Sequence, residues 1–234
     1  MSDGSVTYTL EGPTAVVRMD DGKANALSDA MIDALLAALA RAEREASALV
    51  LAGRTDRFSG GFDLRPMISD PASACALLRH GADLLLALYA TPLPLVIACT
   101  GHALAAGALL VLTGDVRIGA EGAFKIGLNE VSLGLPVPML AMELARDRIA
   151  PTELPRATLQ AQIYTPDEAV RAGYLDAVVP VEGLLDRARA DAARLGAFGR
   201  SAYGATKERL RGRTVRSIRE NLDQDIAALM ALPG

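Results

Sequence analysis

The chain has 234 residues, of which 51% are hydrophobic and 22% are charged, and its formal net charge is −4. This length and apolar content suffice for one large domain or two small ones with a buried core. The slightly acidic balance, with basic residues scattered along the chain, argues against nucleic acid or an anionic membrane as a partner. The two cysteines are too few for a disulfide framework, and the two histidines offer little material for a zinc site or a serine–histidine triad.

The amino-terminal residues Met1–Ser5 are polar and lack the basic start and apolar stretch of a signal peptide. The most apolar run, residues 103–112, is about half as long as a membrane-spanning helix needs to be. We therefore expect a cytoplasmic protein with no membrane partner.

The first half of the chain alternates between strand and helix patterns. Residues 6–10 and 15–19 flank the turn at Gly12-Pro13 and predict a hairpin. Ser28 is a suitable N-cap for a helix that ends near residue 45. There follow a strand at 48–52, a glycine-bearing loop at 53–64, a helix at 74–89, a strand at 95–99, a buried helix at 105–112 and short strands at 116–118 and 124–126. This alternation predicts right-handed βαβ units, a mainly parallel sheet and the α/β class.

After Pro136 nearly every segment has a helical pattern. The predicted helices cover residues 139–147, 153–160, 166–172, 182–195 and 214–230. We expect a core region over residues 1–190 and a helical carboxy-terminal region over residues 191–234. The latter would pack on its own core or on a neighbouring subunit.

Three segments carry residues suited to catalysis, although each also has a structural interpretation. In residues 57–64 the Gly60-Gly61 pair permits backbone conformations that aim amides at a ligand, or simply forms a turn. In residues 101–107 small residues lead into an apolar helix, whose free N–H groups suit an anion or allow close packing. In residues 126–136 an apolar environment would raise the pKa of Glu130 for acid–base catalysis, unless this carboxyl group lies in a solvated turn.

Four blocks of sequence, in this order, resemble the signature blocks of the crotonase (enoyl-CoA hydratase/isomerase) superfamily. They are Lys23-Ala24-Asn25-Ala26-Leu27, Phe58–Leu64, Thr100–Gly107 and Thr165–Asp176. The resemblance implies a ββα spiral core, an acyl-CoA thioester as substrate, no cofactor besides the coenzyme A of that substrate, and a homotrimer or hexamer.

The resemblance also implies roles for individual residues. The backbone N–H groups of Phe62 and Ala106 match the oxyanion hole of the superfamily, and Glu130 matches its acid–base residue. The remaining positions match the coenzyme A and acyl site, in which Asp63 would also fix its loop and Asn129 would either orient Glu130 or line the pocket. These positions are Lys23, Ala24, Ala26, Gly60, Gly61, Asp63, Leu64, Arg65, Leu109 and Asn129.

The resemblance distinguishes two reactions through Leu109. Hydratases of the superfamily use two glutamates, and the second position corresponds to Leu109, which cannot orient a water molecule. The Δ3,Δ2-enoyl-CoA isomerases use one glutamate, and Gly127-Leu128-Asn129-Glu130 resembles their motif. We therefore expect first a shift of the double bond from 3-enoyl-CoA to 2-enoyl-CoA. Hydration of 2-enoyl-CoA, and acyl-CoA binding without catalysis, stay open as alternatives.

Overall fold

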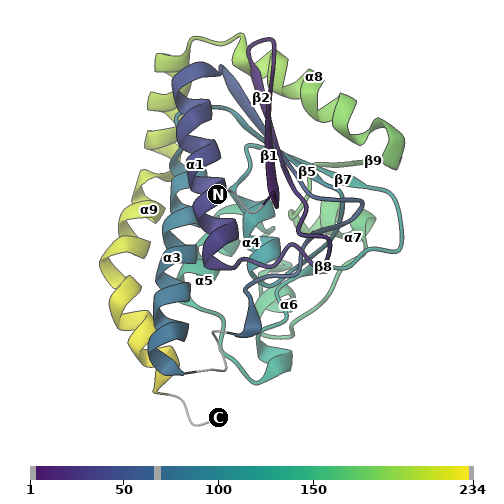
Figure 1. Cartoon of the computed structure of the whole chain (residues 1–234). Coiled ribbons are helices and arrows are strands. Elements are labelled where there is room, and N and C mark those ends of the chain that lie inside the picture. Colours follow the sequence, from purple (N-terminus) through teal and green to yellow (C-terminus); the bar gives the residue numbers. More distant parts are fainter. Residues whose placement is uncertain (1–3, 66–69, 232–234) are drawn as a thin grey trace.

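The computed structural model describes residues 4–65 and 70–231 (Figure 1). A large sheet has the strand order β1-β2-β3-β5-β7-β9, in which β1 and β2 are antiparallel and all other neighbours are parallel. Its strands are β1 (Val6–Glu11), β2 (Thr14–Met19), β3 (Ala48–Ala52), β5 (Leu95–Cys99), β7 (Val116–Ala120) and β9 (Ala177–Val179). The predicted hairpin, the mainly parallel sheet and the α/β class are confirmed.

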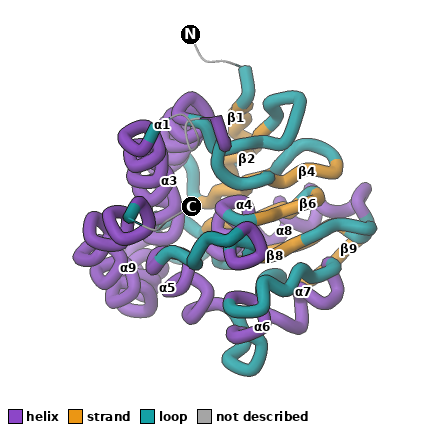
Figure 2. Tube along the Cα trace, turned by 90° about the horizontal axis from the view of Figure 1, so that it is seen from below, coloured by secondary structure: helices purple, strands orange, loops and turns teal. Residues whose placement is uncertain are grey.

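A smaller parallel sheet consists of β4 (Asp56–Ser59), β6 (Gly101–Leu104) and β8 (Ile126–Gly127), which lie side by side in Figure 2. Along the chain β4 follows β3, β6 follows β5 and β8 follows β7, so the backbone winds through both sheets in a repeating spiral. Two of these strands correct the prediction, which treated residues 53–64 as a loop and assigned no strand to residues 101–104. Both strands have only four residues, too few to show a clear apolar alternation.

Different helices cover the two faces of the large sheet. The helix α8 (Leu184–Gly196) packs on one face, where it clusters with side chains of the sheet such as Val50 of β3. The other face carries Leu49 and Leu51 of β3. These side chains share a core with α1 (Asp29–Glu45), α3 (Pro71–Ala90) and α4 (Ala106–Thr113). This division follows from the alternation of side chains along a strand. The remaining shorter helices are α5 (Met139–Arg148), α6 (Leu154–Thr158) and α7 (Pro166–Ala172), with 3₁₀ turns η1 (Val131–Leu133) and η2 (Val181–Gly183).

The long helix α9 (Arg200–Met230) packs against α3 and α5 of the same chain (Figure 1). The sequence predicted a helix only from Thr214, because Lys207 and Arg211 lie on the buried side of α9 and interrupt the apolar spacing. The expectation of an almost wholly helical second half also missed β9, a strand of three residues. The proposed division into residues 1–190 and 191–234 falls within α8 and stays a prediction.

No helix within residues 4–65 and 70–231 is long and apolar enough to cross a membrane. The apolar run at residues 103–112 contributes instead to α4, whose residues are all buried inside the protein. This placement agrees with the prediction of a buried helix.

Candidate active site

The segment at residues 23–27 fixes the loop that carries Phe62. Asn25 is fully buried, and its amide group donates hydrogen bonds to the carbonyls of Met19, Arg57 and Phe58 at 3.1–3.2 Å. Its φ of 50° lies in the left-handed region, which asparagine tolerates better than most residues. Asn25 belongs to the first signature block, but its role could not be recognised from the sequence, because two of its three acceptors are distant along the chain.

Backbone hydrogen bonds on either side of Phe62 complete this attachment. The Leu27 amide donates to the Gly61 carbonyl at 2.8 Å, and the Asp63 amide donates to the Leu27 carbonyl at 3.1 Å. The Gly60 amide donates to the Ala24 carbonyl at 2.8 Å. Phe62 lies between these bonded amides, and its own N–H group donates to no acceptor within the described part of the chain. The loop therefore presents the N–H group of Phe62 as a free backbone donor in a fixed position.

The start of α4 lies against this loop. A Cβ atom on Gly61 would lie 3.4 Å from the Ala106 nitrogen, and one on Gly107 would lie 2.1 Å from the Ser59 carbonyl oxygen. Glycine at these positions thus permits the close approach that was expected of both segments. Ala106 is the first residue of α4, so its N–H group has no acceptor within that helix. Two backbone donors, one from each segment, are consequently available beside each other, and the helix start favours negative charge there.

A small apolar cavity of about 40 Å³ begins at Phe62 and Leu109. The phenyl ring of Phe62 packs on α3, where a Cβ atom on Gly81 would lie 2.1 Å from its Cε1 atom. Leu109 of α4 is 4% exposed. Residues from α3, α5 and α9 complete the wall: Leu78, Ala82, Leu85, Pro138, Leu140, Leu222, Asp225, Ile226 and Leu229. The cavity is therefore lined by Phe62, whose N–H group is free, and by Leu109, whereas Ala106 and Glu130 are not among its lining residues.

Glu130 follows β8 and precedes the turn η1. Its segment is tied to the start of α4, because the Ala105 amide donates to the Gly127 carbonyl at 3.0 Å. The side-chain oxygen Oε2 of Glu130 is buried and has no hydrogen-bond partner among the described residues, and the same holds for Oδ1 of Asn129. Burial raises the pKa of Glu130 above its ordinary value, while the backbone amides of Glu130 and Asn129 partly oppose this shift. The alternative of a fully solvated carboxylate is wrong.

The other predicted binding residues gather on two adjoining segments. Lys23 and Ala24 are exposed and Ala26 is half-buried, and the bonds described above bring them beside the loop at residues 60–65. Asp63 is buried and accepts hydrogen bonds from Arg65, whose guanidinium lowers the pKa of the Asp63 carboxyl group. Asp63 therefore fixes its loop as expected. The role of this surface in binding coenzyme A stays a prediction.

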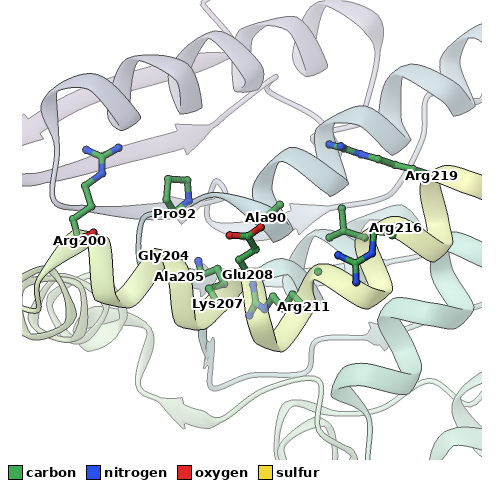
Figure 3. Close-up of a pocket in the computed structure, with 13 residues that line it drawn as sticks. Ala90, Pro92, Arg200, Gly204, Ala205, Lys207, Glu208, Arg211, Arg216 and Arg219 are labelled. Carbon is green, nitrogen blue, oxygen red and sulfur yellow. The ribbon is translucent and has the colours of Figure 1, made fainter.

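A larger groove, of about 820 Å³, runs along the first half of α9 and contains none of the predicted site residues. Figure 3 shows its lining, which includes Arg200, Lys207, Arg211, Arg216 and Arg219. Lys207 and Arg211 are buried and pair with Asp115 of the segment before β7. These contacts have a structural explanation, so the groove is a poorer candidate for the reaction than the surroundings of Glu130.

Comparison with known proteins agrees with this geometry. Residues 10–233 match the family model described as enoyl-CoA hydratase/isomerase. The chain belongs to this family. A crystal structure of a family member from Pseudomonas syringae superposes with a TM-score of 0.95 at 36% identity, covering 98% of this chain and 100% of the other. The crotonase fold expected from the four sequence blocks is thereby confirmed.

Named relatives within the enoyl-CoA hydratase/isomerase family include both activities. The human mitochondrial enoyl-CoA delta isomerase 1 is 30% identical over 217 residues, which cover 91% of this chain and 72% of the relative. A probable enoyl-CoA hydratase from Rhodobacter capsulatus is 33% identical over 211 residues, which cover 89% of this chain and 81% of the relative. The family is established by these similarities, and the choice between the two reactions depends on the residues of the site.

Proposed function

We propose that this protein is an enoyl-CoA isomerase that moves the double bond of a 3-enoyl-CoA to the 2-position. The observation that carries the proposal is the unpaired, buried Oε2 atom of Glu130 combined with leucine at position 109. A buried carboxylate oxygen without a partner is costly to maintain, which is a reason to expect that it serves the reaction. An isomerase needs one such group, whereas the superfamily's hydratases use a second glutamate at the position of Leu109.

In the proposed reaction the thioester oxygen accepts hydrogen bonds from the N–H groups of Phe62 and Ala106. Glu130 takes a proton from C2, the electrons move onto the thioester oxygen to give a dienolate, and Glu130 returns the proton to C4. The double bond then joins C2 and C3, so atoms and electrons balance. The raised pKa of Glu130 favours this double role. A carboxyl group accepts and donates a proton more readily when its pKa is shifted toward the working pH.

Hydration remains a second candidate because of Asp225. This residue lies in the wall of the same cavity as Phe62 and Leu109, and the relative from Rhodobacter capsulatus is named a probable hydratase. A second carboxylate near the cavity is the feature that a hydratase would need. However, Oδ2 of Asp225 already accepts a hydrogen bond from the Met139 amide at 2.7 Å. This engagement supports isomerisation over hydration.

The test is an assay of wild-type protein and the Glu130→Gln variant with 3-enoyl-CoA and 2-enoyl-CoA, following both double-bond shift and water addition. Loss of a general acid–base group typically costs about 10²- to 10⁴-fold in rate. We expect isomerisation in the wild type and a loss within or above that range in the variant. Retention of activity within a few-fold would exclude Glu130 as the base. Water addition that depends on both Glu130 and Asp225 would establish the hydratase, and binding without any turnover would establish a non-catalytic acyl-CoA protein.

A further inference from the structure

Helix α9 forms one wall of the apolar cavity that Phe62 and Leu109 also line. Leu222, Ile226 and Leu229 of α9 follow helical spacing and face the cavity. The other walls include Leu85 of α3 and Leu140 of α5, which belong to the main hydrophobic core and are 1% and 6% exposed. The last turns of α9 have exposed residues on their outer side, among them Ala227 and Ala228. The α9 wall is therefore the part of the cavity with least protein behind it.

The present volume limits what the cavity accepts. A cavity of about 150 Å³ lined by leucine, isoleucine and phenylalanine holds a benzene molecule, which has six carbons. By that scale the space of about 40 Å³ holds one or two carbons. If carbons C1 to C4 of the acyl chain occupy the reaction site between the free amides and Glu130, the chain can extend only to about C6. A longer chain has to displace the wall.

One side-chain hydrogen bond joins this wall to the start of helix α5, which also lines the cavity. Helix α5 begins at Met139 after Pro138, whose side chain cannot cap it. The cap comes from Asp225 of α9 instead, since its Oδ2 atom accepts the Met139 amide at 2.7 Å. A carboxylate at a helix start gains from both the charge-assisted bond and the helix dipole. Both this bond and the ion pair between Arg79 of α3 and Asp223 are exposed, but the ion pair contributes less because it does not cap a helix start.

We propose that the end of α9 is an adjustable wall of the acyl site and that the Asp225–Met139 hydrogen bond restricts it to short acyl chains of about six carbons. The inference rests on the proposed function, because it takes the cavity behind Phe62 and Leu109 as the acyl site. It assigns to Asp225 a role in specificity instead of a role in proton transfer. The preferred substrates are thus short-chain enoyl-CoA thioesters.

The experiment measures binding of saturated acyl-CoA thioesters, hexanoyl-CoA and decanoyl-CoA, by titration calorimetry. These ligands lack the double bond, so binding is measured without turnover. We expect the wild type to bind hexanoyl-CoA at least tenfold more tightly than decanoyl-CoA. Asp225→Ala should reduce this preference about tenfold, because it removes the acceptor for the Met139 amide. Asp225→Asn keeps an acceptor oxygen and should retain the preference within about threefold.

Two further variants keep the test decisive. Leu229→Ala enlarges the end wall directly and should also shift binding toward decanoyl-CoA, even if Asp225→Ala fails to fold. Arg79→Ala removes the exposed tether and should leave the preference unchanged. Equal binding of the two thioesters by wild type, or an unchanged preference in folded Asp225→Ala and Leu229→Ala, would overturn the inference alone. Failure of wild type to bind either thioester would overturn the proposed function together with it.

Discussion

Two regions of the molecule bury charged side chains, and they differ in whether those charges are paired. Under the first half of α9, Asp115 lies 2.6 Å from Lys207 Nζ and 2.8 Å from Arg211 Nη2, and all three side chains are at most 11% exposed. Arg211 also donates to the carbonyls of Tyr89, Thr113 and Gly114, so only its Nε atom lacks a partner among the described residues. This region uses its charges to join α9 to the sheet.

The region around Glu130 leaves its polar atoms without partners. The Glu130 Oε2 atom, the Asn129 Oδ1 atom and the Phe62 amide have no hydrogen-bond partner within the described chain. Unpaired buried groups reduce stability, whereas paired ones contribute to it or are neutral. The difference indicates that the Asp115 cluster serves the fold, and the unpaired atoms around Glu130 agree with the proposed role of this region in binding a substrate. Substitutions in the two regions should therefore affect different measured properties.

The largest expected effect is a loss of stability in the Asp115→Asn variant. Removing the carboxylate leaves Lys207 and Arg211 buried without a counter-charge, and breaking a buried pair in this way costs about 3–5 kcal/mol. Urea unfolding should show that loss, while kcat of the folded variant stays close to wild type. Asp83→Asn, at an exposed position of α3, is the control and should change stability by less than about 0.5 kcal/mol. Unfolding of both variants at the wild-type urea concentration would contradict the structural role of the cluster.

The second prediction concerns the loop beside the start of α4. In Gly61→Ala the new methyl group would meet the Leu104 carbonyl oxygen at 3.1 Å and the Ala105 Cβ atom at 3.2 Å, at a φ of 99°. The loop and the helix start must then separate, which displaces one or both free amides. Loss of one oxyanion donor costs about 10²- to 10³-fold in rate, so we expect kcat/KM to fall by that factor.

The matched control for this loop is Gly12→Ala in the β1–β2 turn. Gly12 also has a positive φ, of 58°, but a methyl group there would have no neighbour within 4 Å. It adds a methyl group at a positive φ without moving the site, so kcat/KM should remain at the wild-type value. An equal loss of activity in both variants would show that strain alone is responsible.

The two regions also differed in how far the sequence revealed them. A glycine pair, a strand leading into an apolar helix, and one acid among apolar residues indicated the segments 57–64 and 101–107 and Glu130, because each pattern is local, whereas Phe62 and Ala106 themselves were assigned from the family resemblance. The Asp115 cluster and the Asp225–Met139 bond were missed, since they join residues 86 or more positions apart or depend on charged residues inside α9. The fold class and most helices followed from periodicity, but the small sheet and the early start of α9 did not.

A third prediction is a pH profile set by Glu130. The base has to be ionised in the free enzyme, and burial raises its pKa above the ordinary value of 4.5. The acidic limb of kcat/KM should therefore rise tenfold per pH unit and bend above that value. The residual activity of Glu130→Gln should lack this limb. A limb that persists in the variant would assign it to another group.

The smallest expected effect is a gain of stability in the same Glu130→Gln variant. Because the folded pKa is raised, the unfolded chain releases its proton first, and the free energy of unfolding of the wild type falls as pH rises between the ordinary and the raised pKa. Glutamine does not ionise and avoids this loss. The variant should thus gain stability within the range of about 0.5–2 kcal/mol typical of single stabilising changes. The gain should be complete above the raised pKa and absent below the ordinary one.

Urea unfolding of wild type and Glu130→Gln at acidic and at neutral pH measures this difference. A gain at neutral pH alone would show that the unpaired carboxylate is maintained at a cost to stability, in contrast to Asp115, whose removal is destabilising. Equal stability of the two proteins at every pH would mean that Glu130 is solvated in the folded protein. The opposite signs expected at Glu130 and Asp115 follow from one physical difference, namely that the Asp115 carboxylate has charged partners, whereas Oε2 of Glu130 has no hydrogen-bond partner among the described residues.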